Sequence, residues 1–339
     1  MRVVFLTRRP RRGANFSVEL IVDGLIENLS PEFECVKAIS RYESLGILPR
    51  IYNVIEAAMR QEEVNHVPGD VHFLTYLLDS RRTILTVLDC GRLGGEMDWR
   101  KRLIRLLWFT IPSRRCAAIT VISESVKREL LQHVPLDPEK VHVVPVAVPS
   151  LYKHVPKAFN AERPRLLQIG TAPNKNLPRL IEAIAPLSCS LDVVGMLNDE
   201  QRKLLVRHGV EYRQFFHVTN EQMLELYSGC DIVAFASTLE GFGMPIIEGN
   251  LVGRPVVTGN VASMPEVAGD AACLVDPLNV ESIRAGFLRV IRDADYRDQL
   301  VKNGFANAER FDHKTVTSKY ETIYRTVAAQ NPGLACARS

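Results

Sequence analysis

A short segment in the second half of the chain is the best guide to its fold, and it reads Thr238-Leu239-Glu240-Gly241-Phe242-Gly243-Met244-Pro245-Ile246-Ile247-Glu248. Residues 232–236, just before it, are all apolar, as in a buried strand of a parallel sheet. From Met244 to Val252 the spacing is helical, and Pro245 occupies a position where the first turn of a helix accepts proline. The segment is therefore predicted to form the turn between the carboxyl end of a strand and the start of a helix.

This turn has the features of a binding site. In an open α/β sheet, ligands bind at the carboxyl ends of the strands, and the free amides at a helix start favour an anion. Gly241 and Gly243 allow a ligand to approach the backbone closely. Glu240 and Glu248 bracket the turn, so both carboxylates can face one crevice and accept hydrogen bonds from sugar or ribose hydroxyls. The spacing leaves a second interpretation open, in which Glu240 is solvated and Glu248 only complements the helix dipole.

Several segments resemble one enzyme family, in the same order along the chain. The pattern from Glu240 to Glu248 resembles the Glu-x7-Glu motif of the retaining, GT-B-type glycosyltransferases, the group 1 or family 4-like enzymes that include sucrose synthase and bacterial mannosyltransferases. Residues 169–177 look like the phosphate loop of that family, with Lys175 as its lysine. Residues 253–257 and 264–272 continue in the family order, and the resemblance extends over residues 165–324.

The resemblance implies that a nucleotide-diphosphate sugar binds to the second half of the chain. By motif position, Lys175 would neutralise the β-phosphate as it leaves, Glu240 would hold the transferred sugar and Glu248 would bind the ribose hydroxyls. Fixed donors stabilise the negative charge that develops when a nucleoside diphosphate departs; the alternative for Lys175 is a surface lysine. The resemblance also implies retention of the anomeric configuration, with no metal and no other cofactor. The donor-binding residues predicted in this way are Gly170, Thr171, Lys175, Val218, Glu240, Gly241, Phe242, Gly243, Met244 and Glu248.

The phosphate loop departs from the family pattern. Most relatives carry an arginine near the lysine, whereas this chain has Thr171 and Asn174 in those places. One positive charge is therefore missing, and Arg179 and Arg254 are candidates to replace it.

A second departure follows the predicted strand at residues 83–88. Relatives commonly place a histidine there, but this chain has Leu88, which cannot donate a hydrogen bond to the sugar. Either Asp89 or another group substitutes for it, or turnover is reduced; the catalytic candidates are Lys175, Glu240 and Asp89. His66 is a further candidate to face the cleft, although a lone histidine is more often structural.

Strands that alternate with helices predict a doubly wound parallel sheet, and the pattern occurs twice. A chain of 339 residues allows two domains, so we predict an α/β, GT-B fold with two Rossmann-like domains that face a cleft. The predicted parts are an acceptor-side domain at 1–150, a linker at 151–164, a nucleotide-sugar domain at 165–310 and a helix at 311–330 that crosses back. Within the first domain, we expect a helix at 51–64 and a strand at 71–76.

A basic run, residues 8–12, lies in the first predicted loop after a strand. In the resembled fold this loop is on the acceptor side, so Arg12, Gly13 and Asn15 are predicted to contact an anionic acceptor such as a phosphorylated lipid or sugar. A solvated basic loop explains the same residues.

Residues 99–115 form a basic amphipathic pattern. Such a helix either lies on anionic lipid or packs on its own sheet with its arginines outward.

No apolar stretch is long enough to span a membrane. The seven cysteines have no paired spacing, which favours a reducing cytosol and gives no metal site. We therefore expect a cytoplasmic protein, with the inner face of an anionic membrane as a candidate partner. The net charge of +3 gives no support for nucleic-acid binding.

The leading functional hypothesis is a metal-independent, retaining glycosyltransferase. It would move a hexose-type sugar from a UDP- or GDP-sugar to a glycan or lipid-linked acceptor. One alternative is a catalytically degenerate subunit that binds nucleotide sugar or stabilises a partner, which Leu88 and Asn174 favour. The other is a nucleotide-sugar epimerase on the same fold, which the Glu-x7-Glu pattern argues against.

Overall fold

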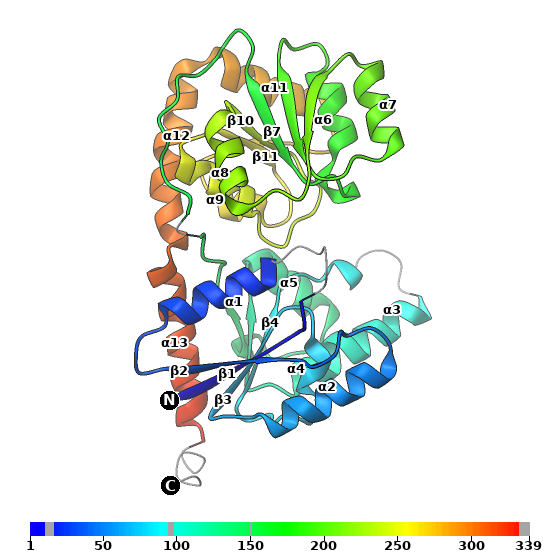
Figure 1. The fold of residues 1–339 in the computed structure, drawn as a ribbon, viewed down its shortest axis with the longest axis vertical. Helices are drawn as coiled ribbons and strands as arrows, with labels where there is room; N and C mark the ends of the chain where they lie inside the picture. The colour runs from blue at the N-terminus through cyan, green and yellow to red at the C-terminus, as the bar shows by residue number, and fades with distance from the viewer. Residues whose placement is uncertain (11–16, 94–97, 150, 332–339) are drawn as a thin grey trace. The chain divides into compact units, whose positions relative to one another are not determined.

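The computed structural model describes residues 1–10, 17–93, 98–149 and 151–331 (Figure 1). The chain forms two compact units, which are described separately below. Unit 1 combines residues Met1–Ala147 with His313–Ser339, and unit 2 is Val148–Asp312. Each unit is built on a six-stranded sheet whose paired strands are all parallel, with helices packed around it. The predicted α/β, GT-B type of architecture is confirmed.

Unit 1 has the strand order β2-β1-β3-β4-β5-β6. Its strands are β1 (Arg2–Thr7), β2 (Glu34–Ile39), β3 (Val64–Pro68), β4 (Thr83–Val87), β5 (Ala118–Val121) and β6 (Val141–Val143). Its helices are α1 (Ser17–Asn28), α2 (Ile47–Met59), α3 (Trp99–Ile104), α4 (Ile111–Arg114), α5 (Glu124–His133) and α13 (His313–Ala329). Its 3-10 turns are η1 (His72–Leu77), η2 (Gly91–Leu93) and η4 (Pro138–Lys140), and the π-helical segment η3 (Arg105–Thr110) joins α3 to α4.

The last helix, α13, completes the core of unit 1. Its side chains Val316, Tyr320 and Tyr324 are buried in one cluster with Val3 and Phe5 of β1. The unit is therefore assembled from the two ends of the chain.

Unit 2 has the strand order β12-β11-β10-β7-β8-β9. Its strands are β7 (Arg165–Ile169), β8 (Ser190–Val194), β9 (Glu211–Phe215), β10 (Ile232–Phe235), β11 (Val256–Gly259) and β12 (Cys273–Val275). Its helices are α6 (Leu177–Ile184), α7 (Asp199–Arg207), α8 (Asn220–Gly229), α9 (Met244–Val252), α10 (Met264–Ala268), α11 (Val280–Arg292) and α12 (Ala294–Ala308), with the short turns η5 (Pro173–Lys175) and η6 (Glu309–Phe311).

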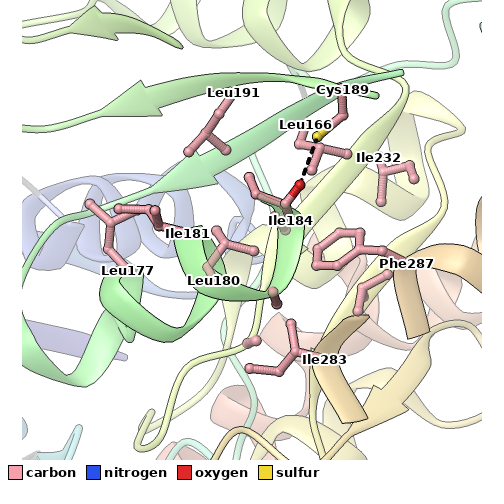
Figure 2. Close-up of a cluster of buried hydrophobic side chains, with 14 of the residues drawn as sticks. Leu166, Leu177, Leu180, Ile181, Ile184, Cys189, Leu191, Ile232, Ile283 and Phe287 are labelled. Carbon is pink, nitrogen blue, oxygen red and sulfur yellow. Dashed lines mark hydrogen bonds between the residues drawn. The ribbon is translucent and has the colours of Figure 1, made fainter. Parts of the chain in front are cut away.

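Helix α6 is anchored firmly in the core of unit 2. Leu177, Leu180, Ile181 and Ile184 have helical spacing and are all buried. Figure 2 shows these side chains in one cluster with residues of β7, β8 and α11, and the Cys189 thiol donates to the Ile184 carbonyl at 3.9 Å. The start of α6, next to Lys175, is therefore held in place by packing.

Two expectations about unit 1 are wrong. The predicted strand at 71–76 is the 3-10 turn η1, in which residues 71–75 are all buried. A short apolar run that is buried on every side has no period that separates a strand from a helix. The predicted helix at 51–64 begins earlier, at Ile47, and ends at Met59, while Val64 already starts β3. Strand β3 was missed because it contains Asn65 and His66, which are polar yet buried.

Candidate functional site

The site predicted from the Glu-x7-Glu pattern lies at the point in unit 2 where the strand order reverses. Strands β7 and β10 are parallel neighbours, with β8 on the far side of β7 and β11 on the far side of β10. The loops that follow these two neighbouring strands, residues 170–176 after β7 and 237–243 after β10, leave the same edge of the sheet. In open α/β sheets this is the position of the ligand crevice.

The loop after β7 is fixed at both ends. Gly170 has φ of +87°, and a Cβ there would lie 3.0 Å from the side chain of Lys175. Gln168 donates from Nε2 to the carbonyls of Gly170 and Lys175, each at 3.1 Å. Asn176 adopts a left-handed conformation at the start of α6, and its buried amide donates to the carbonyls of Ala236 and Pro277 at 2.9 and 2.6 Å. The position of Lys175 is therefore set by the backbone around it.

Lys175 and Glu240 form an ion pair between the two loops. Lys175 Nζ lies 2.7 Å from Glu240 Oε1 and 4.9 Å from the centre of the Phe235 ring. The side chains of Lys175 and Glu240 are only 21% and 13% exposed, so the pair is shielded from water. Asn174, which stands where relatives have an arginine, bridges the loops by donating from Nδ2 to the Leu239 carbonyl at 2.9 Å.

The turn before α9 contains a glycine in a left-handed backbone conformation. Gly243 has φ of +122°, a value that side-chain-bearing residues rarely adopt, and α9 begins at Met244 with Pro245 in its first turn. Phe242 is buried edge-on against Phe311, with ring centres 5.4 Å apart. Ser263 lies in the loop between β11 and α10. Its Oγ is 2.9 Å from the carbonyl oxygen of Glu240 and 2.6 Å from that of Phe242, so the hydroxyl donates a hydrogen bond to this turn. Sequence reasoning did not find Ser263.

Glu248 lies in α9 and accepts a hydrogen bond from the hydroxyl of Tyr227 in α8. Burial raises the pKa of Glu248 to about 7, and the Tyr227 hydrogen bond and the charge of Lys175 oppose that rise. Tyr227 is fully buried and packs edge-on against Tyr152, with ring centres 5.4 Å apart. Lys175 thus acts on both carboxylates, through the ion pair with Glu240 and through its field at Glu248. Neither tyrosine was predicted from the sequence.

Comparison with known proteins gives matches along most of the chain. Residues 15–150 match the model described as Glycosyltransferase Family 4, and residues 153–306 match the model described as Glycosyl transferases group 1. This chain belongs to these glycosyltransferases.

Individual relatives agree with that assignment. The chain is 30% identical over 260 residues to O-antigen chain mannosyltransferase B of Escherichia coli, an alignment that covers 73% of this chain and 61% of the relative. It is 26% identical over 253 residues to the MMP alpha-(1->4)-mannosyltransferase of Mycolicibacterium hassiacum. That alignment covers 68% of this chain and 61% of the relative. The match thus spans 61% of the length of each of these curated relatives.

Solved structures share the fold. The Anabaena HepE structure in complex with UDP and glucose has a TM-score of 0.78 at 19% identity and covers 96% of this chain and 100% of its own. WaaG, a glycosyltransferase involved in lipopolysaccharide biosynthesis, has a TM-score of 0.70 at 16% identity and covers 96% of this chain and 99% of its own.

Other predicted donor residues of this glycosyltransferase lie further along the same sheet edge. The Thr171 hydroxyl donates to the Met196 carbonyl at 2.7 Å, which ties the phosphate loop to the loop after β8. Val218 lies in the turn between β9 and α8, so β8 separates its strand from β7. Val218 therefore belongs to a more distant part of the edge than Lys175.

The two arginines proposed to replace the missing charge differ in their surroundings. Arg254 is buried and donates to the carbonyls of five residues, namely Tyr227, Val252, Gly253, Val155 and Ser228. Its hydrogen bonds are therefore committed to the fold. Arg179 is half-buried on α6, and its Nη1 donates to Asn176 Oδ1 at 3.0 Å, next to the phosphate loop. Arg179 is the better placed of the two.

The candidates in the first half of this glycosyltransferase belong to unit 1. Asp89 is exposed and accepts a hydrogen bond from the Gly91 amide at 3.0 Å. Arg12, Gly13 and Asn15 lie outside the described residues. Arg8, from the same basic run, is paired with Glu19 at 3.0 Å and Asp70 at 2.7 Å.

His66 is structural. It is buried and hydrogen-bonded to the hydroxyls of Tyr324 at 2.8 Å and Thr86 at 2.7 Å, within unit 1. Burial lowers its pKa to about 3, so the ring is neutral at physiological pH. The histidine joins α13 to the sheet.

Among the described residues, no group of three or more His, Cys, Asp or Glu side chains is arranged to hold a metal ion. The six described cysteines are free thiols. No described helix combines the length and the apolar character needed to cross a membrane.

Proposed function

We propose that this protein is a retaining glycosyltransferase that moves a hexose-type sugar from a UDP- or GDP-sugar to a glycan or lipid-linked acceptor. The observation that supports it most is the shielded ion pair of Lys175 and Glu240 at the crevice between the loops after β7 and β10. The names of the curated relatives make mannose the first sugar to test.

The ion pair suggests how a donor is accommodated. A diphosphate is a stronger partner for Lys175 than one carboxylate, so its binding draws the ammonium group away from Glu240. The Glu240 carboxylate is then free to accept hydrogen bonds from the hydroxyls of the sugar. Lys175 and Glu240 therefore exchange partners when the donor binds.

The reaction breaks the bond between the anomeric carbon and an oxygen of the β-phosphate, and the electron pair stays on the diphosphate. In this proposal, the Lys175 ammonium group and the backbone amides at the start of α9 stabilise that charge. The acceptor hydroxyl forms the new bond to the anomeric carbon, and its proton passes to the departing diphosphate. With these donors in place, we expect turnover to be independent of divalent metal, which an assay with and without EDTA checks.

The first experiment is a thermal-shift series with UDP, GDP, ADP and their common sugars, including the mannose derivative. A ligand that binds only the folded state raises the midpoint, so a shift with one nucleotide series identifies the donor class. Donor hydrolysis measured in the same samples separates an enzyme from a degenerate binder. The degenerate alternative is favoured by Asn174, whose amide bridges the loops in place of a cation. A shift without any turnover would support that alternative.

The site assignment is tested by Lys175→Ala, Glu240→Ala and Glu248→Ala. We expect each variant to fold and to lose at least about tenfold in turnover, because each removes a charged group from a preorganised site. Arg284→Ala, which removes a cation on α11, is the control. Turnover near the wild-type rate in all three variants contradicts the assignment.

We also infer a cytoplasmic protein that associates peripherally with the inner face of an anionic membrane. The helical stretch of α3, η3 and α4 contains five basic residues and no acidic one, and it exposes Trp99, Leu103 and Leu107. Such a helix suits an anionic lipid surface. Absence of binding to anionic vesicles at low salt would rule this out.

A further inference from the structure

Helix α2 of unit 1 presents an apolar stripe to solvent. Ile47, Ile51, Ile55 and Met59 recur every fourth residue, which places them along one face of the helix, and Leu48 lies beside them. The most exposed residues of the stripe are Ile47, Leu48 and Met59, which are 75%, 79% and 72% exposed. The opposite face, with Asn53, Val54 and Ala57, is buried in the unit. A contiguous exposed apolar surface of this kind marks an interaction site.

Within α2 and its C-cap, the charged side chains that reach solvent are positive. The one acidic residue of α2, Glu56, is buried, where it pairs with Arg60 at 2.7 Å and accepts from the Arg41 amide at 2.9 Å. The side chains of Arg41 and Arg60 are exposed at the polar edge of the helix. An apolar stripe with a cationic edge and no exposed carboxylate of its own matches an anionic, partly apolar partner.

The basic stretch of α3, η3 and α4 adjoins this helix. The Arg50 guanidinium of α2 lies 5.1 Å from the centre of the Trp108 ring in η3, and both elements pack on η1. Beside η3 is a cavity of about 590 Å³, whose lining includes Arg102, Arg105 and His133. The Arg50–Trp108 contact thus joins the basic stretch to the helix that carries the apolar stripe.

We propose that α2 is the element that inserts into the membrane, with its stripe among the acyl chains and the arginines of α2 and η3 at the lipid phosphates. This inference rests on the peripheral association proposed above and identifies the surface responsible. A second copy of the chain is a poorer occupant, because its own α2 offers the same cationic side chains and no exposed carboxylate to pair with them. An anionic bilayer instead neutralises those charges.

The experiment is co-sedimentation of the full chain with vesicles of phosphatidylcholine alone or with one-third phosphatidylglycerol, at low salt. The α2 variant is Ile51→Glu with Ile55→Glu, which places two carboxylates on the stripe. We expect at least an approximately tenfold weaker partition onto the anionic vesicles, since each carboxylate would have to enter the apolar interface. Val206→Glu, at an apolar side chain of α7 that is 74% exposed, is the matched control and should bind as the wild type does.

A milder variant, Leu48→Ser with Met59→Ser, should reduce partition without adding charge, which keeps the inference testable if the double glutamate variant folds poorly. Nucleotide thermal shifts on all variants report separately on the donor site, so loss of membrane binding is distinguished from failure of the proposed activity. If both α2 variants bind like the wild type while Arg102→Glu does not, the basic stretch alone holds the membrane and the inference is wrong. It is also wrong if light scattering shows a dimer that the α2 variants dissociate and the wild type does not bind vesicles.

Discussion

At the scale of single residues, the pairing of Tyr227 with Glu248 has a consequence for pH. Under the proposed role, Glu248 must be ionised to accept hydrogen bonds from both ribose hydroxyls. Its pKa of about 7 means that nucleotide affinity should rise as the pH increases through neutrality. Tyr227→Phe removes a hydrogen bond that lowers this pKa, so the midpoint of the rise should move to higher pH.

Calorimetric titration of the nucleoside diphosphate between pH 6 and 9 measures this effect. For each unit of pKa shift, the ionised fraction well below the pKa falls about tenfold, so the variant should bind more weakly at pH 7 and recover at pH 9. Tyr212→Phe, in β9, removes a hydroxyl elsewhere in the unit and should leave the midpoint unchanged. An identical midpoint in Tyr227→Phe and the wild type would show that the tyrosine does not tune the carboxyl.

Gly243 gives a second residue-scale prediction. With φ of +122° and a would-be Cβ 3.1 Å from Ile246 Cδ1, Gly243→Ala should lower the free energy of unfolding by about 1–3 kcal/mol. It should also weaken nucleotide binding, because the start of α9 must move. Gly209→Ala is the matched control, since Gly209 has φ of +63° but open space around it. Urea denaturation of both variants provides the comparison, and equal losses would mean that crowding at Gly243 is unimportant.

At the scale of elements, Arg254 connects three segments. Its guanidinium donates to the end of α8, the end of α9 and the segment at Val155. Lysine offers a single ammonium group in place of this planar fork, so Arg254→Lys leaves buried carbonyls without donors. We expect a loss of roughly 2–3 kcal/mol in the free energy of unfolding, measured by urea denaturation. Arg284→Lys, at a more exposed site that also binds carbonyls, should lose less. Equal losses at the two positions would contradict the idea that Arg254 joins these elements.

The elements also show what the sequence can and cannot predict. Helix α9 was predicted with its observed bounds, because Pro245 and Gly253 mark its start and end locally. Lys175, Glu240 and Glu248 were found as candidates because each stands in a recognisable motif, on the loops after the neighbouring strands β7 and β10 and on helix α9. Tyr227 and Ser263 escaped prediction, since each reaches the site from a different element and neither has a local pattern. Strand β3 was missed because its buried polar residues find partners only in the folded sheet.

At the scale of the whole molecule, unit 1 requires α13. Removal of residues 313–339 would uncover the cluster that contains Val3, Phe5 and Tyr324. We therefore expect a chain that ends at Asp312 to be poorly soluble and to lose protease resistance in unit 1, while unit 2 stays protected. A chain that ends at Asn331 is the control and should behave like the full protein. Limited proteolysis followed by mass spectrometry distinguishes the two units, and a protease-resistant unit 1 in the shorter chain would refute this dependence.

The return of the chain to unit 1 also sets an order for folding during synthesis. The first 147 residues leave the ribosome long before His313 is made, and the 165 residues between them take about ten to thirty seconds to translate. Unit 2 is continuous and is able to finish folding in that interval, whereas the nascent first sheet must wait with Phe5 and Val64 uncovered. We therefore expect the yield of this protein in a cell to depend on protection of that unfinished surface by chaperones, as well as on the stability of the finished molecule.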